Sequence, residues 1–116
     1  MNYHYSILLL YNVKVMEAKD MKWTNENTDL LCEALISIKT KEDCYDFLED
    51  VCTIKEVLDM SQRLSVAMLL SQKVSYSEIN EKTGASSATI CRVSKCYEYG
   101  NGGYKKIIER ISKPEK

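Results

Sequence analysis

The sequence predicts an all-α protein built as a helical bundle, and three observations support this fold class. One Pro and four Gly occur in 116 residues, and such scarcity of helix breakers favours long helices over a β protein with many turns. Apolar residues recur at three- and four-residue steps through most of the chain, which is typical of helices with one buried face. Hydroxyl residues that suit helix caps stand where the predicted helices begin.

The composition, with 45% apolar and 28% charged residues, is that of one soluble globular domain. We place this domain at residues 24–116, after an N-terminal arm at residues 1–23. The apolar run of the arm, Ile7 to Tyr11, is too short to span a bilayer, and no signal peptide is recognisable around it. Two interpretations of the arm stay open: residues 1–20 lie upstream of the true start, or the arm contacts a partner subunit.

Five cysteines, an odd number without a C-x-x-C pair, indicate reduced thiols and a cytoplasmic location. Cys44 and Cys52 occupy apolar positions of a helical pattern, so we interpret them as buried hydrophobic residues rather than zinc ligands. The only histidine is His4, and no paired acids or phosphate-binding loop stand at catalytic spacings. We therefore expect no enzyme, no metal site and no cofactor.

Two amphipathic helices are predicted first, since two apolar sets each line one helical face. Hydroxyl residues followed three positions later by an acid mark three helix starts, at Thr40, Thr53 and Ser75. We expect both of the first helices to belong to the core. The first set is Leu30, Leu31, Ala34, Leu35 and Ile38, and the second is Cys44, Phe47, Leu48, Val51 and Cys52.

The third predicted helix, residues 53–72, carries an unusually broad apolar stripe. A stripe this broad exceeds what one small subunit covers, so we predict a homodimer in which the helix is shared between the core and the subunit interface. The alternative is the central helix of a monomeric bundle. The centre of the stripe is Ile54, Val57, Leu58, Leu64 and Met68, and Met60, Ala67, Leu69 and Leu70 widen it.

A helix-turn-helix is predicted at residues 75–96 from the segment SYSEINEKTGASSATICRV. Ser75 caps a short helix, Gly84 suits a left-handed turn, and Ser86 caps a second helix. The inward-facing residues of the two helices are Ile79, Ile90 and Val93.

The opposite face of the second helix is predicted to contact DNA. Small residues at the first turn let a helix end approach base edges closely, and hydroxyl groups donate to or accept from the bases. Basic residues farther along the helix are placed to contact phosphate. The candidate DNA-binding residues are Ser75, Tyr76, Ser86, Ser87, Ala88, Thr89, Arg92 and Lys95.

Charge is distributed unevenly, although the whole chain has a net charge of −1. Residues 82–113 contain seven basic and two acidic residues, a balance of +5, whereas residues 26–59 contain ten acidic and three basic residues, a balance of −7. One end of the molecule is therefore suited to phosphates and the other avoids them.

Three segments carry a resemblance to a known family: TIKEVLDMSQRL at residues 53–64, GASSATICR at residues 84–92, and the loop YGNGGY at residues 99–104. On these segments, residues 24–111 resemble the trp repressor superfamily, and specifically its YerC/YecD group of trp-repressor-like proteins. The segment at residues 84–92 is the most specific part. The resemblance implies an all-helical, intertwined homodimer whose paired reading heads enter successive major grooves of double-stranded DNA, and it implies a repressor of transcription.

The resemblance also implies a ligand site, because members of the family proper bind free tryptophan as corepressor. Thr53, Arg63 and Arg92 match ligand-binding positions of the family. Two departures argue against tryptophan here: Val93 replaces a pocket glycine, where it would fill space that the ligand needs, and Cys96 replaces a serine that is the better hydrogen-bond partner. Arg63 and Arg92 would then pair with acidic residues or bind phosphate.

The predicted function is therefore that of a sequence-specific DNA-binding transcriptional regulator, a repressor that binds as a dimer. Control by a small-molecule effector of unknown identity stays open. The alternative is a protein-interaction adaptor that keeps the helix-turn-helix fold without operator binding, which the modest net charge would suit. Salt dependence separates the two, because DNA binding that releases counterions weakens steeply with salt.

Overall fold

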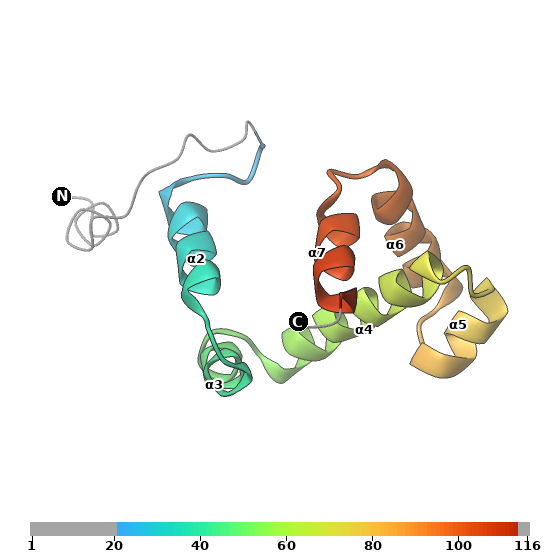
Figure 1. Ribbon diagram of the computed structural model, residues 1–116, viewed down its shortest axis with the longest axis horizontal. Helices are drawn as coiled ribbons and strands as arrows, with labels where there is room; N and C mark the ends of the chain where they lie inside the picture. Colours follow the sequence, from blue (N-terminus) through green and yellow to red (C-terminus); the bar gives the residue numbers. More distant parts are fainter. Residues whose placement is uncertain (1–20, 114–116) are drawn as a thin grey trace. The chain divides into compact units, whose positions relative to one another are not determined.

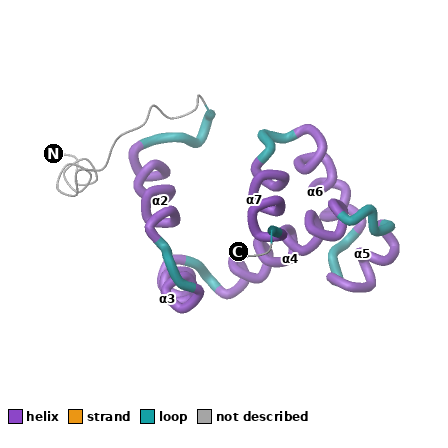
Figure 2. Tube along the Cα trace, in the orientation of Figure 1, coloured by secondary structure: helices purple, strands orange, loops and turns teal. Residues whose placement is uncertain are grey.

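The computed structural model describes residues 21–113, and this part of the chain consists of six α-helices and no strand (Figures 1 and 2). The all-α prediction is therefore confirmed. The predicted N-terminal arm lies outside the described residues except for residues 21–23. The helices are α2 (Glu26–Ser37), α3 (Lys41–Val51), α4 (Ile54–Ser71), α5 (Tyr76–Thr83), α6 (Ser87–Tyr99) and α7 (Gly103–Ser112).

The first compact unit of the chain ends at Asp50 and contains α2 and nearly all of α3. Both helices begin at side-chain caps. Asn25 Oδ1 accepts from the Thr28 amide at 2.9 Å while the Asn25 amide donates to Thr28 Oγ1 at 2.8 Å, and Thr40 Oγ1 accepts from the Asp43 amide at 3.1 Å. The Thr40 start was predicted, whereas the Asn25 cap was not.

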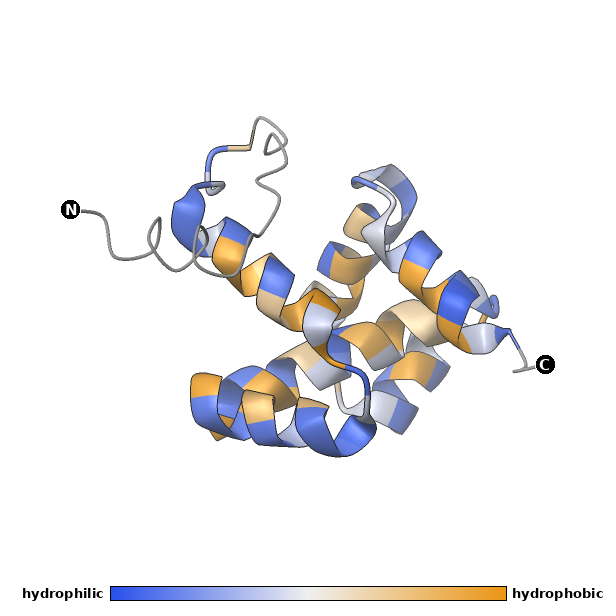
Figure 3. Ribbon diagram, turned by 60° about the vertical axis from the view of Figure 1, so that its left-hand side comes forward, coloured by the Kyte–Doolittle hydropathy of each residue, from blue (hydrophilic) through white to orange (hydrophobic). Residues whose placement is uncertain are grey.

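No residue of α2 or α3 is buried within the chain. The two predicted helices are thus present, but the expectation that they form part of the core is not met in a single chain. Hydrophobic residues appear in orange along α2, the helix that directly follows the grey trace in Figure 3. Leu31 is 43% exposed and Val51 is 51% exposed, so these helices carry apolar surface without a core of their own.

The second unit, from Val51 onward, contains the buried core. The long helix α4 packs against α5, α6 and α7, and α6 also packs against α5 and α7 (Figure 1). The predicted start of α4 is confirmed as a complete capping box: Thr53 Oγ1 accepts from the Glu56 amide, and Glu56 Oε1 accepts from the Thr53 amide. The buried residues are Val66, Ala67, Ile79, Ala85, Ile90, Val93 and Ile108.

The last helix, α7, was not placed from the sequence, although its pattern is visible there. Tyr104 lies three and four residues before Ile107 and Ile108, and Ile111 lies four and three residues after them, which puts all four on one helical face. Ile108 enters the core, while Ile107 and Ile111 remain 44% and 57% exposed. The helix therefore closes the core with Ile108, against which the half-buried Tyr104 also packs, and presents Ile107 and Ile111 outward.

All five cysteines are free thiols, and Cys44 and Cys52 are half-buried rather than buried. None of the described helices combines the length and apolar character needed to cross a bilayer.

Candidate nucleic-acid interface

The predicted helix-turn-helix is present as α5, a three-residue turn and α6. Ser75 Oγ accepts from the Glu78 amide at 3.3 Å, and Ser86 Oγ accepts from the Thr89 amide at 3.2 Å. Gly84 ends α5 with φ = 72°, a left-handed conformation that costs an L residue with a side chain about 1–2 kcal/mol. The caps and the glycine therefore fix where both helices begin and end.

Two amide side chains that the sequence analysis missed hold this turn. Asn80 Nδ2 donates to the Ala85 carbonyl at 2.7 Å, across the turn, and Gln62 Nε2 of α4 donates to the Thr83 carbonyl at 3.1 Å. Asn80 could have been suspected, because amide side chains often bond the backbone of a nearby turn. Gln62 lies in a different helix, and no local sequence signal links it to the turn.

One side of α6 is buried and the other is open. Ile90 and Val93 are each 1% exposed, which confirms their predicted inward orientation. All of the predicted DNA contacts except the half-buried Thr89 are exposed, and those beyond the first residue of α6 are Ala88, Arg92 and Lys95. Their spacing of four and three residues places them on one face of the helix. Ser87, at the first turn of α6, and Cys91 are also exposed.

The other hydroxyl candidates already have partners. Ser75 and Ser86 cap α5 and α6, and Ser86 Oγ also donates to Thr89 Oγ1 at 3.1 Å. Serine and threonine serve both helix caps and DNA contacts, so residue type alone did not separate the two roles. Within the described residues, Ser87 is the candidate hydroxyl of the α6 first turn that makes no hydrogen bond to the protein.

Tyr76, another predicted DNA contact, connects the two helices of the motif. Its hydroxyl donates to Ser94 Oγ at 2.8 Å, which joins the first residue of α5 to the middle of α6. Tyr76 is 46% exposed and Ser94 is half-buried. Ser94 was not among the residues predicted from the sequence.

Within the part of the chain that the structure describes, the exposed cations of α6 form no ion pair. Lys82 and Lys113 form exposed intrahelical pairs with Glu78 and Glu109, at 3.6 and 3.2 Å. Within residues 21–113, no carboxylate lies within ion-pair distance of Arg92 or Lys95, so the predicted alternative that Arg92 pairs with an acid is not met there. Both cations are available to bind an anion.

The three predicted ligand residues do not meet in one chain. Thr53 and Arg63 are ten residues apart on α4 and its cap, about 15 Å along a helix axis, and the Thr53 hydroxyl is engaged in the capping box. Arg63 and Arg92 instead both act on Tyr104. Burial raises the pKa of the Tyr104 hydroxyl, and the charges of Arg63 and Arg92 oppose this rise. Tyr104 was not among the site residues predicted from the sequence.

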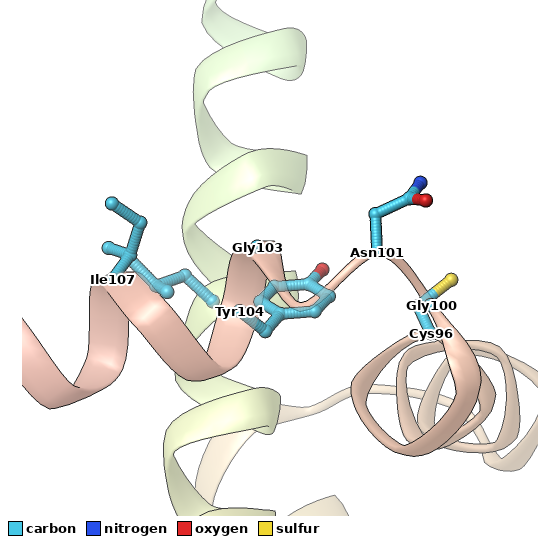
Figure 4. Close-up of a pocket in the computed structure, with 7 residues that line it drawn as sticks. Cys96, Gly100, Asn101, Gly103, Tyr104 and Ile107 are labelled. Carbon is cyan, nitrogen blue, oxygen red and sulfur yellow. The ribbon is translucent and has the colours of Figure 1, made fainter. Parts of the chain in front are cut away.

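A pocket of about 480 Å³ lies beside Tyr104. It is bounded by the C-terminal end of α6, the loop to α7 and the first turns of α7 (Figure 4). Cys96 lines it, whereas the Val93 side chain is turned into the core. That Val93 fills space needed by tryptophan at the family's ligand site stays a prediction. The lining residues are Leu64, Cys96, Gly100, Asn101, Gly103, Tyr104 and Ile107.

The fold and the α6 face can now be compared with known proteins. The family model described as Trp repressor protein matches residues 26–112, which include every described helix of the chain. The chain belongs to the Trp repressor family. Members of this family are DNA-binding regulators, and the match covers the whole helix-turn-helix.

Individual relatives agree with this family assignment. The uncharacterised protein YerC of Bacillus subtilis (strain 168) is 40% identical over 94 residues, which span 81% of this chain and 90% of that protein. A solved TrpR-like protein from Eubacterium eligens ATCC 27750 is 46% identical, with a TM-score of 0.76 over 82% of this chain and 98% of that one. A solved Trp repressor candidate from Staphylococcus aureus is 34% identical, with a TM-score of 0.77 over 85% and 100% of the two chains. The predicted membership in the YerC group of trp-repressor-like proteins is confirmed.

Proposed function

We propose that the protein is a sequence-specific transcriptional regulator, a repressor that binds double-stranded DNA as a homodimer through residues 75–96. The proposal rests on the open face of α6, which presents small residues at its first turn and Arg92 and Lys95 in the following turns. Membership in the Trp repressor family supports it.

The order of residue types along α6 suits a helix that enters the major groove with its N-terminal end. Ser87 and Ala88 are small enough to let the backbone approach base edges, and Ser87 brings an uncommitted hydroxyl to them. Arg92 and Lys95, which have no acidic partner within the described residues, would neutralise phosphates and release counterions. Specificity would therefore come from the first turn, and affinity from the turns that follow.

The proposed homodimer is supported by the apolar surface that one chain leaves exposed. No residue of α2 or α3 is buried, and in α4 Ile54 and Leu58 are 74% and 62% exposed. Covering such side chains is favourable by about 25 cal/mol for each Å² removed from water. A second copy would supply matching apolar surfaces, and a twofold dimer would present two copies of α6 to two half-sites.

Selection of bound fragments from random duplex DNA by the purified protein tests the proposal, followed by binding measurements at several salt concentrations. Ala88→Trp should abolish sequence-specific binding while the circular dichroism spectrum stays unchanged. Lys95→Ala should weaken binding to all sequences similarly and lower the salt slope by about one unit. If both variants alter only stability, α6 does not contact DNA and the proposal is wrong.

We also propose that free L-tryptophan is not a tight corepressor of this protein. The argument rests on Cys96, which lines the pocket beside Tyr104 with a thiol where the family has a better hydrogen-bond partner. Calorimetry should detect no tryptophan binding, or binding only at millimolar concentration, and Cys96→Ser should strengthen any binding that occurs. Micromolar binding coupled to tighter DNA binding would contradict this proposal.

A protein-interaction adaptor is the second candidate function, favoured by the net charge of −1. An adaptor would show no sequence preference in the selection and no steep salt dependence, whereas a regulator would show both.

A further inference from the structure

We propose that Tyr76 is a positioning residue for DNA recognition, which sets the orientation of α6 through Ser94 rather than by contacting phosphate itself. The inference rests on the proposed function and names a residue pair that determines its specificity. The observation behind it is the 2.8 Å hydrogen bond from the Tyr76 hydroxyl to Ser94 Oγ.

The position of this bond gives it control over the angle between α5 and α6. At one end of α5, the turn is held by Asn80, which bonds the Ala85 carbonyl, and by Gln62, which bonds the Thr83 carbonyl. At the other end of α5, the bond from Tyr76 reaches α6 eight residues beyond its Ser86 cap. Two attachment points at opposite ends of α5 prevent α6 from pivoting about the turn, which a single attachment would permit.

The buried contacts between the two helices do not replace this directional bond. Ile79, Ile90 and Val93 hold the helices together, but apolar contact is largely non-directional and permits small rotations. Contacts to base edges tolerate errors of only about 0.5 Å and 10–20°. The Tyr76–Ser94 bond is the side-chain hydrogen bond that joins the bodies of α5 and α6 within the described residues.

The same bond argues against a direct phosphate contact by Tyr76. A phosphate oxygen accepts hydrogen bonds, so a tyrosine must donate to it, and a phenol has a single O–H. With Tyr76 as the donor of the 2.8 Å bond, that proton is engaged by Ser94. Ser94 lies on the inward side of the exposed α6 face and is itself half-buried, which leaves Tyr76 as its partner across the helix pair.

The test uses the full-length protein with the selected operator duplex and a scrambled duplex, and compares Tyr76→Phe, Ser94→Ala and the double variant. Each single variant should lose about threefold to tenfold in operator affinity, the range expected for one hydrogen bond. Binding to scrambled DNA and the salt slope should stay unchanged. The double variant should lose no more than either single variant, and Ser94→Thr, which keeps the hydroxyl, should restore binding.

Three results would overturn the inference. The first is a loss for Tyr76→Phe on both duplexes with no effect of Ser94→Ala, because that pattern marks a phosphate contact. The second is additive losses in the double variant, which would show independent roles. The third is unchanged operator affinity in both single variants.

Amide hydrogen exchange of the DNA-free protein separates failure of this inference from failure of the proposed function. Both single variants should exchange faster in α6, and the double variant should be no faster than either. If the wild-type protein shows no sequence preference for DNA, the proposed function is wrong, and hydrogen exchange alone tests whether the Tyr76–Ser94 bond restrains α6. Unchanged exchange in α6 of both single variants would then refute that role of the bond.

Discussion

The two units of the chain differ in what covers their apolar side chains. In the second unit, α4, α5, α6 and α7 bury seven residues against one another, including Ile79 and Ile90. In the first unit, α2 and α3 bury none, although they carry predicted apolar faces of the same kind. An amphipathic pattern therefore predicts a helix with an apolar face, but does not say whether the same chain covers that face.

The largest effect should come from matched substitutions on the two sides of this comparison. Ile90 is 1% exposed and Ile36, on the side of α2 away from its apolar stripe, is 76% exposed. Ile90→Ala should lower the free energy of unfolding by about 2–5 kcal/mol, because it removes buried contacts and leaves a cavity. Ile36→Ala should change it by about 0.5 kcal/mol or less. Urea titration at one protein concentration measures the change in the free energy of unfolding for both variants. Equal losses of stability would contradict the difference between the buried and the exposed position.

The second prediction asks whether another copy covers the apolar stripe of α2. Leu31 lies on this stripe, whereas Ile36 lies on the opposite side of the helix. Leu31→Glu should raise the dimer dissociation constant by about 100-fold or more, since it would bury a charge without a partner. Light scattering should report twice the chain mass for wild type and for Ile36→Glu, but a lower mass for Leu31→Glu. A wild-type protein that stays monomeric at micromolar concentration would refute the proposed dimer.

The third prediction concerns the turn that joins α5 and α6. Gly84→Ala should destabilise the protein by about 1–2 kcal/mol, because alanine is strained in a left-handed conformation. Gly84 has φ = 72°, and a Cβ added there would meet no atom within 4 Å, so the cost is one of backbone conformation rather than a clash. Gly103→Ala is the control, since that glycine also has open space around it but no positive φ. Thermal unfolding should separate the two variants.

The smallest effect concerns the start of α4, at the junction of the two units. The Thr53 amide and hydroxyl lower the pKa of Glu56 below its ordinary value of 4.5. The folded state therefore favours the ionised form of Glu56 more than the unfolded state does. The resulting contribution to the free energy of unfolding is present above the unfolded pKa and is lost as the pH falls through the folded pKa. Glu56→Gln should therefore lose less stability than wild type between neutral and acidic pH.

Melting temperatures across this pH range test the Glu56 prediction. Glu81→Gln is the control, because within residues 21–113 the Glu81 side chain makes no hydrogen bond or ion pair. An identical pH response of Glu56→Gln and wild type would contradict the predicted contribution of the capping box.

Local signals allowed most of the second unit to be predicted. Thr53, Ser75, Gly84 and Ser86 each act through neighbours within a few residues, and all four take their predicted roles. The side of α4 that the chain itself covers was harder to predict. Val66 is fully buried but lay outside the predicted stripe, because periodicity within α4 does not show which of its sides α5 and α6 contact.

The candidate site was predicted less completely, because its geometry depends on residues far apart in the chain. The Tyr76–Ser94 and Gln62–Thr83 bonds join residues 18 and 21 positions apart, and no periodic pattern indicates such pairs. The ligand residues were taken from a family pattern, which does not state whether all of them come from the same chain. Thr53 and Arg63 lie about 15 Å apart along one helix axis, a separation that the family pattern did not reveal.

Translation delivers α2 and α3 before any residue of the buried core. Their helix starts are already specified by Asn25 and Thr40 when they leave the ribosome, but a helix of this length is only marginally stable in water without packing. The core of the second unit is completed only when Ile108, near the end of the chain, has been made. Between these two events the nascent chain exposes the apolar side chains of both units, and apolar surface exposed in this way is prone to aggregation.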